Sequence, residues 1–202
     1  MTTTAFVSGA TGFLAAHIIK QLLAKGFKVV GSVRSTAKGD ELKQSIGSDL
    51  FQYEVVEHLE DEGAFNKALK KHPEITVFFH AASPVVFNVA DNEKDVILPA
   101  VNGTVNVLKA IKKDAPQIKK VIITASIVSI SSPGEDKTVD ESLVSNVTWE
   151  QGKENSQLAY PASKTFAEKA AWKFLEDEKP NFSISTIHPV YIFGSQAFGI
   201  LK

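Results

Sequence analysis

The sequence predicts an α/β fold with a doubly wound parallel sheet, on the strength of three observations. Short apolar runs that favour strands alternate along the chain with patterns that favour helices, which is typical of a parallel sheet covered on both faces. A glycine-rich turn joins the first of these strands to the first helix. The chain has 202 residues, of which 44% are hydrophobic and 22% charged, enough to bury a sizeable core.

The expected elements follow one another from the N-terminus. The first helix has apolar residues at Leu14, Ile18 and Leu22, the spacing of one helix face. Pro73 and Pro116 end the second and third helices. Right-handed crossovers between the strands then give a Rossmann-type sheet. We predict strands at residues 4–8, 27–33, 51–57, 75–80, 121–125 and 183–188, helices at 14–25, 62–71, 96–113 and 156–178, and a polar surface excursion at 131–155.

The turn after the first strand has the pattern of a phosphate-binding loop. It reads Gly9-Ala10-Thr11-Gly12-Phe13-Leu14-Ala15, a Gly-x-x-Gly-x-x-Ala variant of the dinucleotide fingerprint. Glycine permits the tight turn and close approach of the backbone to a pyrophosphate, and the small third residue lets helix and strand pack. The helix N-terminus adds free N–H groups and a positive dipole end. The sequence therefore predicts a dinucleotide site.

The end of the second strand indicates which dinucleotide is bound. An Asp or Glu there would bind the adenosine ribose hydroxyls and indicate NAD, but this chain continues with basic residues, Arg34 and Lys38. A guanidinium fork suits a 2′-phosphate, and a lysine adds a second positive charge. We predict NADPH/NADP as the cofactor, and a solvated basic turn is the alternative.

Tyr160 and Lys164 are the candidates for proton transfer. Four residues apart on the last helix, they share one face, about 5–6 Å apart at Cβ. An ammonium near a phenol favours the phenolate, which makes the phenol usable in proton transfer. Ser126 follows the fifth strand, where the carboxyl ends of parallel strands border the ligand crevice. Its hydroxyl is placed to hydrogen-bond a substrate carbonyl, and a strand-end serine bonded to local backbone is the alternative.

Together these residues resemble the extended short-chain dehydrogenase/reductase superfamily, and within it the fungal NADPH-dependent methylglyoxal and aldehyde reductases, relatives of plant dihydroflavonol reductases. The resemblance runs over essentially the whole chain. The motifs that carry it are Ser8-Gly9-Ala10-Thr11-Gly12-Phe13, His80-Ala81-Ala82-Ser83-Pro84, Pro99-Ala100-Val101-Asn102-Gly103-Thr104 and Lys164-Thr165-Phe166-Ala167-Glu168-Lys169-Ala170-Ala171-Trp172.

The resemblance implies a role for each matching residue. Ser126, Tyr160 and Lys164 would form the catalytic triad, with Tyr160 and Lys164 also touching the cofactor. In such reductases the B face of the nicotinamide delivers hydride to a carbonyl carbon while the tyrosine donates the proton. The implied cofactor-binding residues are Gly9, Thr11, Gly12, Phe13 and Leu14 on the pyrophosphate, Arg34 and Lys38 on the 2′-phosphate, Ala81 and Ser83 along the cofactor, and Pro189 and Val190 beside the nicotinamide.

Several positions depart from the family pattern. His58-Leu59 replaces the usual Asp and apolar pair that contacts adenine. Val85 follows the proline of the fourth-strand motif, and Ile127 follows the catalytic serine. The family often has an aromatic residue at each of these two positions. His188 replaces the usual Asn before the last proline, and Ser195 replaces a proline after Phe-Gly. These changes are expected to reshape the adenine contact and the carbonyl pocket.

Composition excludes several other functions. The formal net charge of −1 gives no electrostatic footprint for nucleic acid or an anionic membrane, and no apolar run is long enough to span a bilayer. Without cysteine there is no disulfide or thiolate metal site, and the five histidines show no metal-ligand spacing. No signal peptide is evident. We therefore expect a cytoplasmic protein with a small-molecule carbonyl substrate, no nucleic-acid or membrane partner and no metal.

The sequence ends shortly after Phe193-Gly194, before the segments that build the substrate lobe in extended reductases. The expectation is one NAD(P)-binding domain over residues 1–202, incomplete at its C-terminus, with the substrate lobe missing. Two alternatives to a carbonyl reductase stay open. One is a catalytically inactive nucleotide-binding remnant, and the other is a sugar-nucleotide epimerase or dehydratase with the same Tyr/Lys pair.

Overall fold

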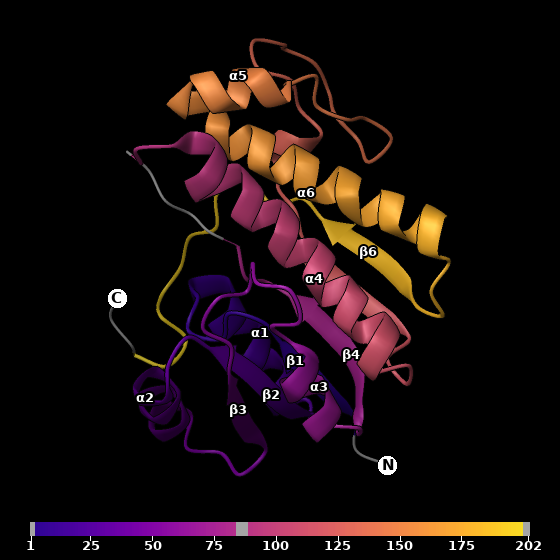
Figure 1. The fold of residues 1–202 in the computed structure, drawn as a ribbon. Coiled ribbons are helices and arrows are strands. Elements are labelled where there is room, and N and C mark those ends of the chain that lie inside the picture. Colours follow the sequence, from indigo (N-terminus) through magenta and orange to yellow (C-terminus); the bar gives the residue numbers. More distant parts are fainter. Residues whose placement is uncertain (1–2, 84–88, 200–202) are drawn as a thin grey trace.

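A six-stranded, wholly parallel sheet forms the centre of the protein (Figure 1). The computed structural model describes residues 3–83 and 89–199. The strand order is β3-β2-β1-β4-β5-β6, so the order reverses between β1 and β4. This reversal is where open α/β sheets bind ligands, at the carboxyl ends of the strands. The strands are β1 (Thr4–Val7), β2 (Lys28–Val33), β3 (Phe51–Val55), β4 (Ile75–His80), β5 (Lys120–Thr124) and β6 (Ser183–Ile187).

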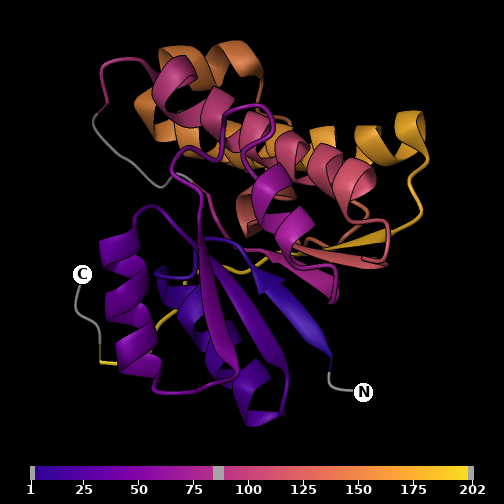
Figure 2. The same ribbon diagram turned by 60° about the horizontal axis from the view of Figure 1, so that its bottom comes forward.

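Helices cover both faces of the sheet. Helices α1 and α2 lie on one face, and α3, α4 and α6 lie on the other, with α5 packed on α6 (Figure 2). The fold is therefore the predicted doubly wound Rossmann-type α/β fold. The helical elements are α1 (Phe13–Ala24), α2 (Thr36–Ile46), α3 (Asn66–Lys71), the π-helix η1 (Glu93–Ile97), α4 (Leu98–Asp114), the 3-10 turn η2 (Ile127–Ser129), α5 (Trp149–Glu154) and α6 (Ser156–Glu178).

The two faces of the sheet bury separate cores because side chains alternate along each strand. In β1, Phe6 points to the face of α3, α4 and α6, and Ala5 and Val7 point to the face of α1 and α2. Phe6 stacks on Phe78 with ring centroids 4.8 Å apart, and Phe65 meets both rings edge to face. These apolar layers fix the strand ends that carry the candidate site.

Helix α2 was not predicted from the sequence. Ser35 begins it, with its Oγ accepting a hydrogen bond from the Lys38 backbone N–H at 3.4 Å. Leu42 is fully buried among the core residues on the α1 side, and Gly47 ends the helix with a left-handed φ of +60°. Because the helix is mostly polar, its apolar stripe is too narrow to read from the sequence.

Helix α5 lies inside the predicted polar surface excursion, where the sequence predicted no helix. Thr148 and Gln151 form a capping box at its start, in which each side chain bonds the other residue's backbone N–H. The other predicted elements are confirmed with small shifts at their ends. The largest shifts are in α3, which begins later than predicted, and at α4, which continues directly from the π-helix η1.

The segment after β6 crosses back toward α1 along the molecule (Figure 1). His17 Nε2 donates a hydrogen bond to the Ser195 carbonyl oxygen at 2.9 Å, and Phe198 packs against the core cluster of α1 and α2. Residues that follow β6 are therefore brought next to the helix that begins at the phosphate turn. Nothing in the described part of the chain forms a helix with the length and apolar character needed to cross a bilayer.

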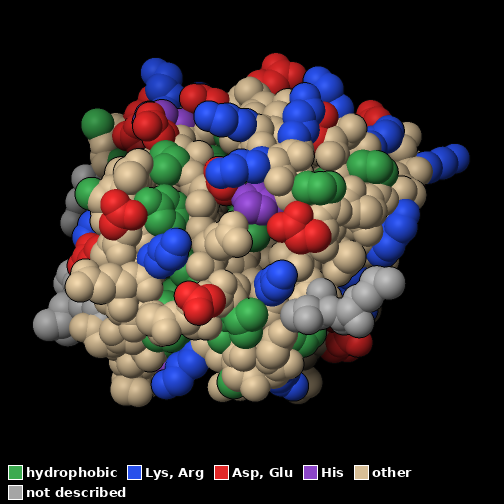
Figure 3. Space-filling model, turned by 90° about the horizontal axis from the view of Figure 1, so that it is seen from below, with side chains coloured by type: hydrophobic (Ala, Val, Ile, Leu, Met, Phe, Trp, Pro, Cys, Tyr) green, Lys and Arg blue, Asp and Glu red, His purple; other side chains and the backbone are tan. Residues whose placement is uncertain are grey.

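Charges of both signs are mixed on the face of the molecule that is seen from below. Lysine and arginine side chains are interspersed there with aspartate and glutamate (Figure 3). Exposed charges also pair along or between elements, for example Lys173 with Asp177 and Lys112 with Glu178. Such exposed pairs contribute little to stability, so the fold depends mainly on its two cores.

Candidate active site

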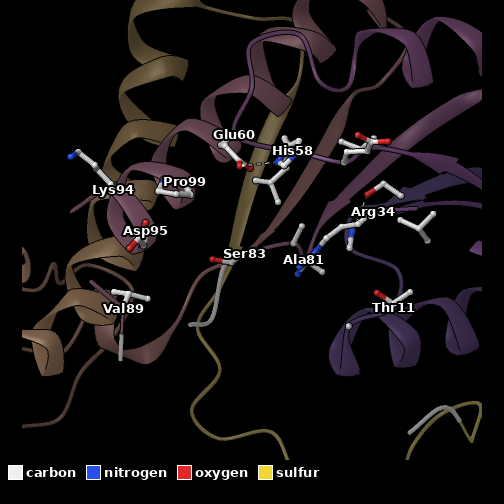
Figure 4. Close-up of a pocket in the computed structure, with 18 residues that line it drawn as sticks. Thr11, Arg34, His58, Glu60, Ala81, Ser83, Val89, Lys94, Asp95 and Pro99 are labelled. Carbon is white, nitrogen blue, oxygen red and sulfur yellow. Dashed lines mark hydrogen bonds and ion pairs between the residues drawn. The ribbon is translucent and has the colours of Figure 1, made fainter. Parts of the chain in front are cut away.

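A cleft of about 570 Å³ opens at the carboxyl ends of β1, β2, β3 and β4. This is within the range of small-molecule and cofactor sites. Thr11 and Arg34 lie toward one end of the cleft, Val89, Lys94 and Asp95 toward the other, and Ala81 and Ser83 between them (Figure 4). The lining comprises Gly9, Thr11, Gly12, Ser32, Val33, Arg34, Val56, Glu57, His58, Leu59, Glu60, Ala81, Ala82, Ser83, Val89, Lys94, Asp95 and Pro99.

Backbone geometry forms the phosphate turn. Gly9 has a φ of +66°, and a Cβ there would lie 3.0 Å from Ala82, so both conformation and space require glycine. The Gly9 N–H donates to Ser32 Oγ at 3.0 Å, and the Gly12 N–H donates to the Gly9 carbonyl at 2.8 Å. The first amides of α1 have no intrahelical acceptor, and no side chain caps them. This arrangement fits a pyrophosphate.

Arg34 follows β2 directly and lines the cleft, as the predicted 2′-phosphate contact requires. Lys38 is placed differently, on the first turn of α2, with its Nζ 2.9 Å from the Glu41 carboxylate and its side chain exposed. It is not among the residues that line the cleft. His58, which stands at the position expected near adenine, also lines the cleft, and its Nδ1 lies 3.4 Å from Glu60 Oε1.

A buried hydrogen-bond network connects the phosphate turn to the end of β4. Ser8 Oγ accepts from the backbone N–H groups of Ala81 and Ala82, each at 3.0 Å, and lies 3.0 Å from His80 Nδ1. Because both N–H groups donate to Ser8, its own hydrogen donates to Nδ1. The segment that would lie along the cofactor is thereby held against the segment that would bind its phosphates.

The same network fixes the tautomer of His80. With Nδ1 accepting, the proton is on Nε2, which lies 3.5 Å from Thr104 Oγ1, and that hydroxyl donates to the Ala100 carbonyl at 2.9 Å. Burial, helped by the nearby ammonium of Lys164, lowers the pKa of His80 to about 3. His80 therefore stays neutral and serves as a fixed link in the network.

Lys164 is the buried cation of the site. It is only 7% exposed, and its Nζ donates to the Thr124 carbonyl at the end of β5, 3.2 Å away. Nζ also lies 6.0 Å from the ring centroid of Tyr160, which is partly exposed. Burial lowers the pKa of Lys164 to about 8, while the carboxylate of Glu168 opposes this shift. The ammonium thus faces the tyrosine one helical turn away, as the spacing predicts.

Ser126 lies at the carboxyl end of β5 and begins the turn η2. It is 6% exposed, in extended conformation, and its Oγ accepts from the Val128 N–H at a long 3.5 Å. Helix α6, which carries Tyr160 and Lys164, packs against this turn. The structure therefore brings the elements of all three predicted catalytic residues together beside the cleft.

The remaining predicted residues border the site without lining the cleft. Phe13 and Leu14 begin α1, and the Phe13 ring meets His17 edge to face at 5.1 Å. After β6, the Pro189 carbonyl accepts from the Ile127 N–H at 3.0 Å, and Val190 is 65% exposed. Pro84 and Val85 lie outside the described residues.

Sequence reasoning missed several polar residues of the site. Ser8 and Ser32 contact the turn, and Thr104 and Glu168 line a cavity of about 10 Å³ beside Lys164. Ala82 and Ser83 border both this cavity and the main cleft. Ser8, Thr104 and Glu168 stand inside the quoted motifs, whereas Ser32 lies in the second strand outside all of them. Among the residues that the structure describes, no cluster of His, Asp or Glu is arranged to hold a metal ion.

Comparison with known proteins identifies the relatives of this chain. Residues 5–198 match the model of the NAD dependent epimerase/dehydratase family. GRP2 of Candida albicans is 52% identical over 98% of this chain and 61% of its own length. The NADPH-dependent methylglyoxal reductase GRE2 of Saccharomyces cerevisiae is 39% identical over 96% of this chain and 59% of its own length.

Solved structures give the same result. The crystal structure of Gre2 from Candida albicans in complex with NADPH superposes with a TM-score of 0.94 at 47% identity, covering 98% of this chain and 60% of that one. The chain thus spans about 60% of the length of the relatives it matches.

Proposed function

The chain belongs to the NAD dependent epimerase/dehydratase family, and we propose that it carries the cofactor-binding and proton-donating parts of an NADPH-dependent carbonyl reductase. The proposed substrate is an aldehyde or ketone, methylglyoxal-like or a branched aldehyde. The observation that carries the proposal is the continuity of the site. The phosphate turn and Arg34 line one cleft, and this cleft shares Ala82 and Ser83 with the cavity beside Lys164.

The residues present fit a bound NADPH. The turn at Gly9 and the open N-terminus of α1 would hold the pyrophosphate, and Arg34 the 2′-phosphate. Ala81 and Ser83 would border the cofactor, and Pro189 and Val190 the nicotinamide end. When bound, NADPH supplies the hydride for reduction. No other group in the site needs to be redox-active.

The protein side of the reaction is proton transfer and orientation. Ser126 Oγ would donate a hydrogen bond to the substrate carbonyl oxygen, which polarises the carbonyl bond. As the carbonyl carbon gains hydride, the Tyr160 phenol would give its proton to that oxygen, leaving an alcohol and a phenolate. The Lys164 ammonium stabilises this phenolate and would hold the cofactor ribose. Water then restores the proton on Tyr160.

Cofactor preference tests the binding half of the proposal. The purified chain is expected to bind NADPH more tightly than NADH, measured by the fluorescence of the reduced nicotinamide. Arg34→Gln should remove most of that preference. Its affinity for NADPH should fall about tenfold and its affinity for NADH should hardly change, because the guanidinium is proposed to contact only the 2′-phosphate. Lys43→Gln, an exposed basic position on α2, is the matched control. Equal affinity of the unaltered chain for the two cofactors would refute the role of Arg34.

Turnover tests the catalytic half. Loss of NADPH absorbance in the presence of methylglyoxal or a branched aldehyde, compared with Tyr160→Phe, measures carbonyl reduction directly. NADPH binding without a rate above that of the variant would favour the inactive nucleotide-binding alternative. Conversion of a sugar nucleotide without net NADPH consumption would favour an epimerase or dehydratase.

A further inference from the structure

The side chain of Glu168 contacts more of the site than any role assigned above uses. It lies one turn after Lys164 on α6, and its side chain is 12% exposed. Trp172 Nε1, one turn further on, donates to Oε1 at 3.4 Å. A carboxylate this deeply placed requires hydrogen-bond donors, and two of its donors come from segments that border the candidate site.

The first donor is Ser129, which ends the turn that begins at Ser126. Ser129 Oγ lies 2.6 Å from Glu168 Oε2 and 2.7 Å from the Ser126 carbonyl oxygen, and Ser129 is 2% exposed. The Ser129 hydroxyl hydrogen is thus shared between the Glu168 carboxylate on α6 and the carbonyl oxygen of Ser126, the residue expected to polarise the substrate. This contact ties the Ser126 turn to α6.

The second donor is His188, which stands directly after β6. Its Nε2 lies 2.9 Å and 3.0 Å from the two carboxylate oxygens of Glu168. The next residue, Pro189, accepts a hydrogen bond from the Ile127 N–H. The segment expected to border the nicotinamide is therefore tied to the same carboxylate and to the same turn as Ser126.

We propose that Glu168 is a positioning residue that holds the Ser126 turn and the Pro189 segment in register with Tyr160 and Lys164 on α6. The proposal rests on the proposed function, because the register matters for catalysis only if these residues act together. The His188 imidazole makes the second link, to both oxygens of the carboxylate. A single carboxylate thereby connects all three segments that carry the chemistry.

The charge of Glu168 gives the proposal a signature that a packing role would lack. The titratable groups around the Lys164 ammonium are Tyr160 and Glu168 from α6, His80 from β4, and His188 beyond Glu168. Glu168 favours the charged lysine, against the burial that lowers its pKa to about 8. Without this carboxylate the pKa of Lys164 should fall further. The ammonium is the active form, so activity falls when Lys164 loses its proton. In Glu168→Gln this alkaline loss of activity should therefore occur at a lower pH than in the wild type.

Three variants separate positioning, charge and stability. Glu168→Gln removes the charge and keeps the size. Ser129→Ala removes the contact to the Ser126 turn and keeps the charge. Glu176→Gln makes the same chemical change at an exposed position of α6, about 12 Å further along the helix, and is the matched control. Thermal unfolding is recorded for each variant.

The first readout needs neither cofactor nor turnover. The chain is labelled with 13C at lysine Cε and the NMR signal of Lys164, assigned by its absence in Lys164→Met, is followed with pH. We expect the Glu168→Gln midpoint to lie below the wild-type midpoint, and the midpoints of Ser129→Ala and Glu176→Gln to match wild type. The second readout is carbonyl reduction, where Glu168→Gln and Ser129→Ala should each lower kcat about tenfold and Glu176→Gln should leave it unchanged.

The outcomes are distinguishable. If the wild type reduces no carbonyl compound, the proposed function is refuted. A lowered Lys164 midpoint in Glu168→Gln would still show that Glu168 acts on Lys164. Wild-type midpoint and wild-type kcat in Glu168→Gln would overturn the positioning role. If Glu168→Gln does not fold, Ser129→Ala decides: an unchanged kcat and KM in that variant would also overturn it.

Discussion

The phosphate turn and the β5–α6 site lie at the same edge of the sheet but are built in different ways. At Gly9–Leu14 the proposed phosphate contacts are backbone N–H groups, and glycine is needed at position 9 because a side chain there would clash with Ala82. At Ser126, Tyr160 and Lys164 the proposed chemistry comes from side chains, and the Lys164 ammonium is only 7% exposed. The turn therefore depends on backbone shape, whereas the second region depends on charge and burial.

This contrast separates binding from catalysis. Changes in the turn should act on cofactor affinity and stability together, because the same backbone does both. Changes at Ser126 or at the Tyr160 hydroxyl should lower the rate while leaving the cofactor bound, and removing the buried charge of Lys164 should even stabilise the fold. The four predictions below test that separation, from the largest expected effect to the smallest.

Tyr160→Phe should produce the largest effect. Loss of the phenolic proton donor is expected to lower the rate of NADPH-dependent carbonyl reduction by about 10²–10⁴-fold. NADPH affinity should change by no more than about twofold. The free energy of unfolding should hardly change, because the aromatic ring remains in place. Steady-state kinetics and nicotinamide fluorescence measure the two quantities. A parallel loss of affinity and rate would show that the two regions are not separable in this way.

Gly9→Ala should affect binding and stability together. The left-handed φ of +66° and the approach of Ala82 to 3.0 Å predict a loss of about 2–4 kcal/mol in the free energy of unfolding, and NADPH binding should weaken at least tenfold. Gly26→Ala is the matched control, since its φ is +79° but a Cβ there meets nothing within 4 Å. It should cost only about 1 kcal/mol and leave NADPH affinity unchanged. Equal behaviour of the two variants in denaturant unfolding and NADPH titration would contradict the prediction.

The sequence predicted both regions through local patterns. The glycine spacing and the Tyr/Lys spacing are short-range, and the elements that carry them occur as expected because their apolar periodicity is strong. Helix α2 was missed because its polar sequence carries Gly39, although that glycine is required: a Cβ there would lie 2.3 Å from the Tyr53 ring. Only the packing of α2 on β3 reveals this constraint.

The contacts behind the site were beyond the reach of sequence reasoning. Ser8 and His80 are 72 residues apart, and Ser129 and Glu168 are 39 residues apart. No periodicity links such pairs, because strand order and helix packing bring them together. The capping box at Thr148, by contrast, is a short-range signal that could have located α5.

Lys164→Met should stabilise the protein while removing a catalytic residue. Burial lowers the pKa of Lys164 from 10.5 to about 8, so between these pH values the unfolded chain binds more protons than the folded chain. The free energy of unfolding therefore rises with pH in this window. Lys164→Met has no buried ammonium, so its free energy of unfolding should exceed that of the wild type by about 1–3 kcal/mol at pH 7. The gain should shrink as pH rises from 8 toward 10.5 in denaturant unfolding. A loss of stability at pH 7, or a gain independent of pH, would contradict this account.

Thr104→Val should have the smallest effect, because it removes only the weaker of the two hydrogen bonds of the His80 ring. Thr104 Oγ1 lies 3.5 Å from His80 Nε2, near the limit of a hydrogen bond, whereas the other side of the ring holds Ser8 at 3.0 Å. The variant keeps the volume but leaves Nε2–H without its acceptor, so we expect a loss of about 0.5–1 kcal/mol in denaturant unfolding and unchanged NADPH affinity. Thr104→Ser, which keeps the hydroxyl, is the matched control. A loss above about 2 kcal/mol, or weaker NADPH binding, would contradict this expectation. It would show that the α4 residue Thr104 fixes the tautomer of His80, and so the contact between the phosphate turn and the end of β4, as much as Ser8 does.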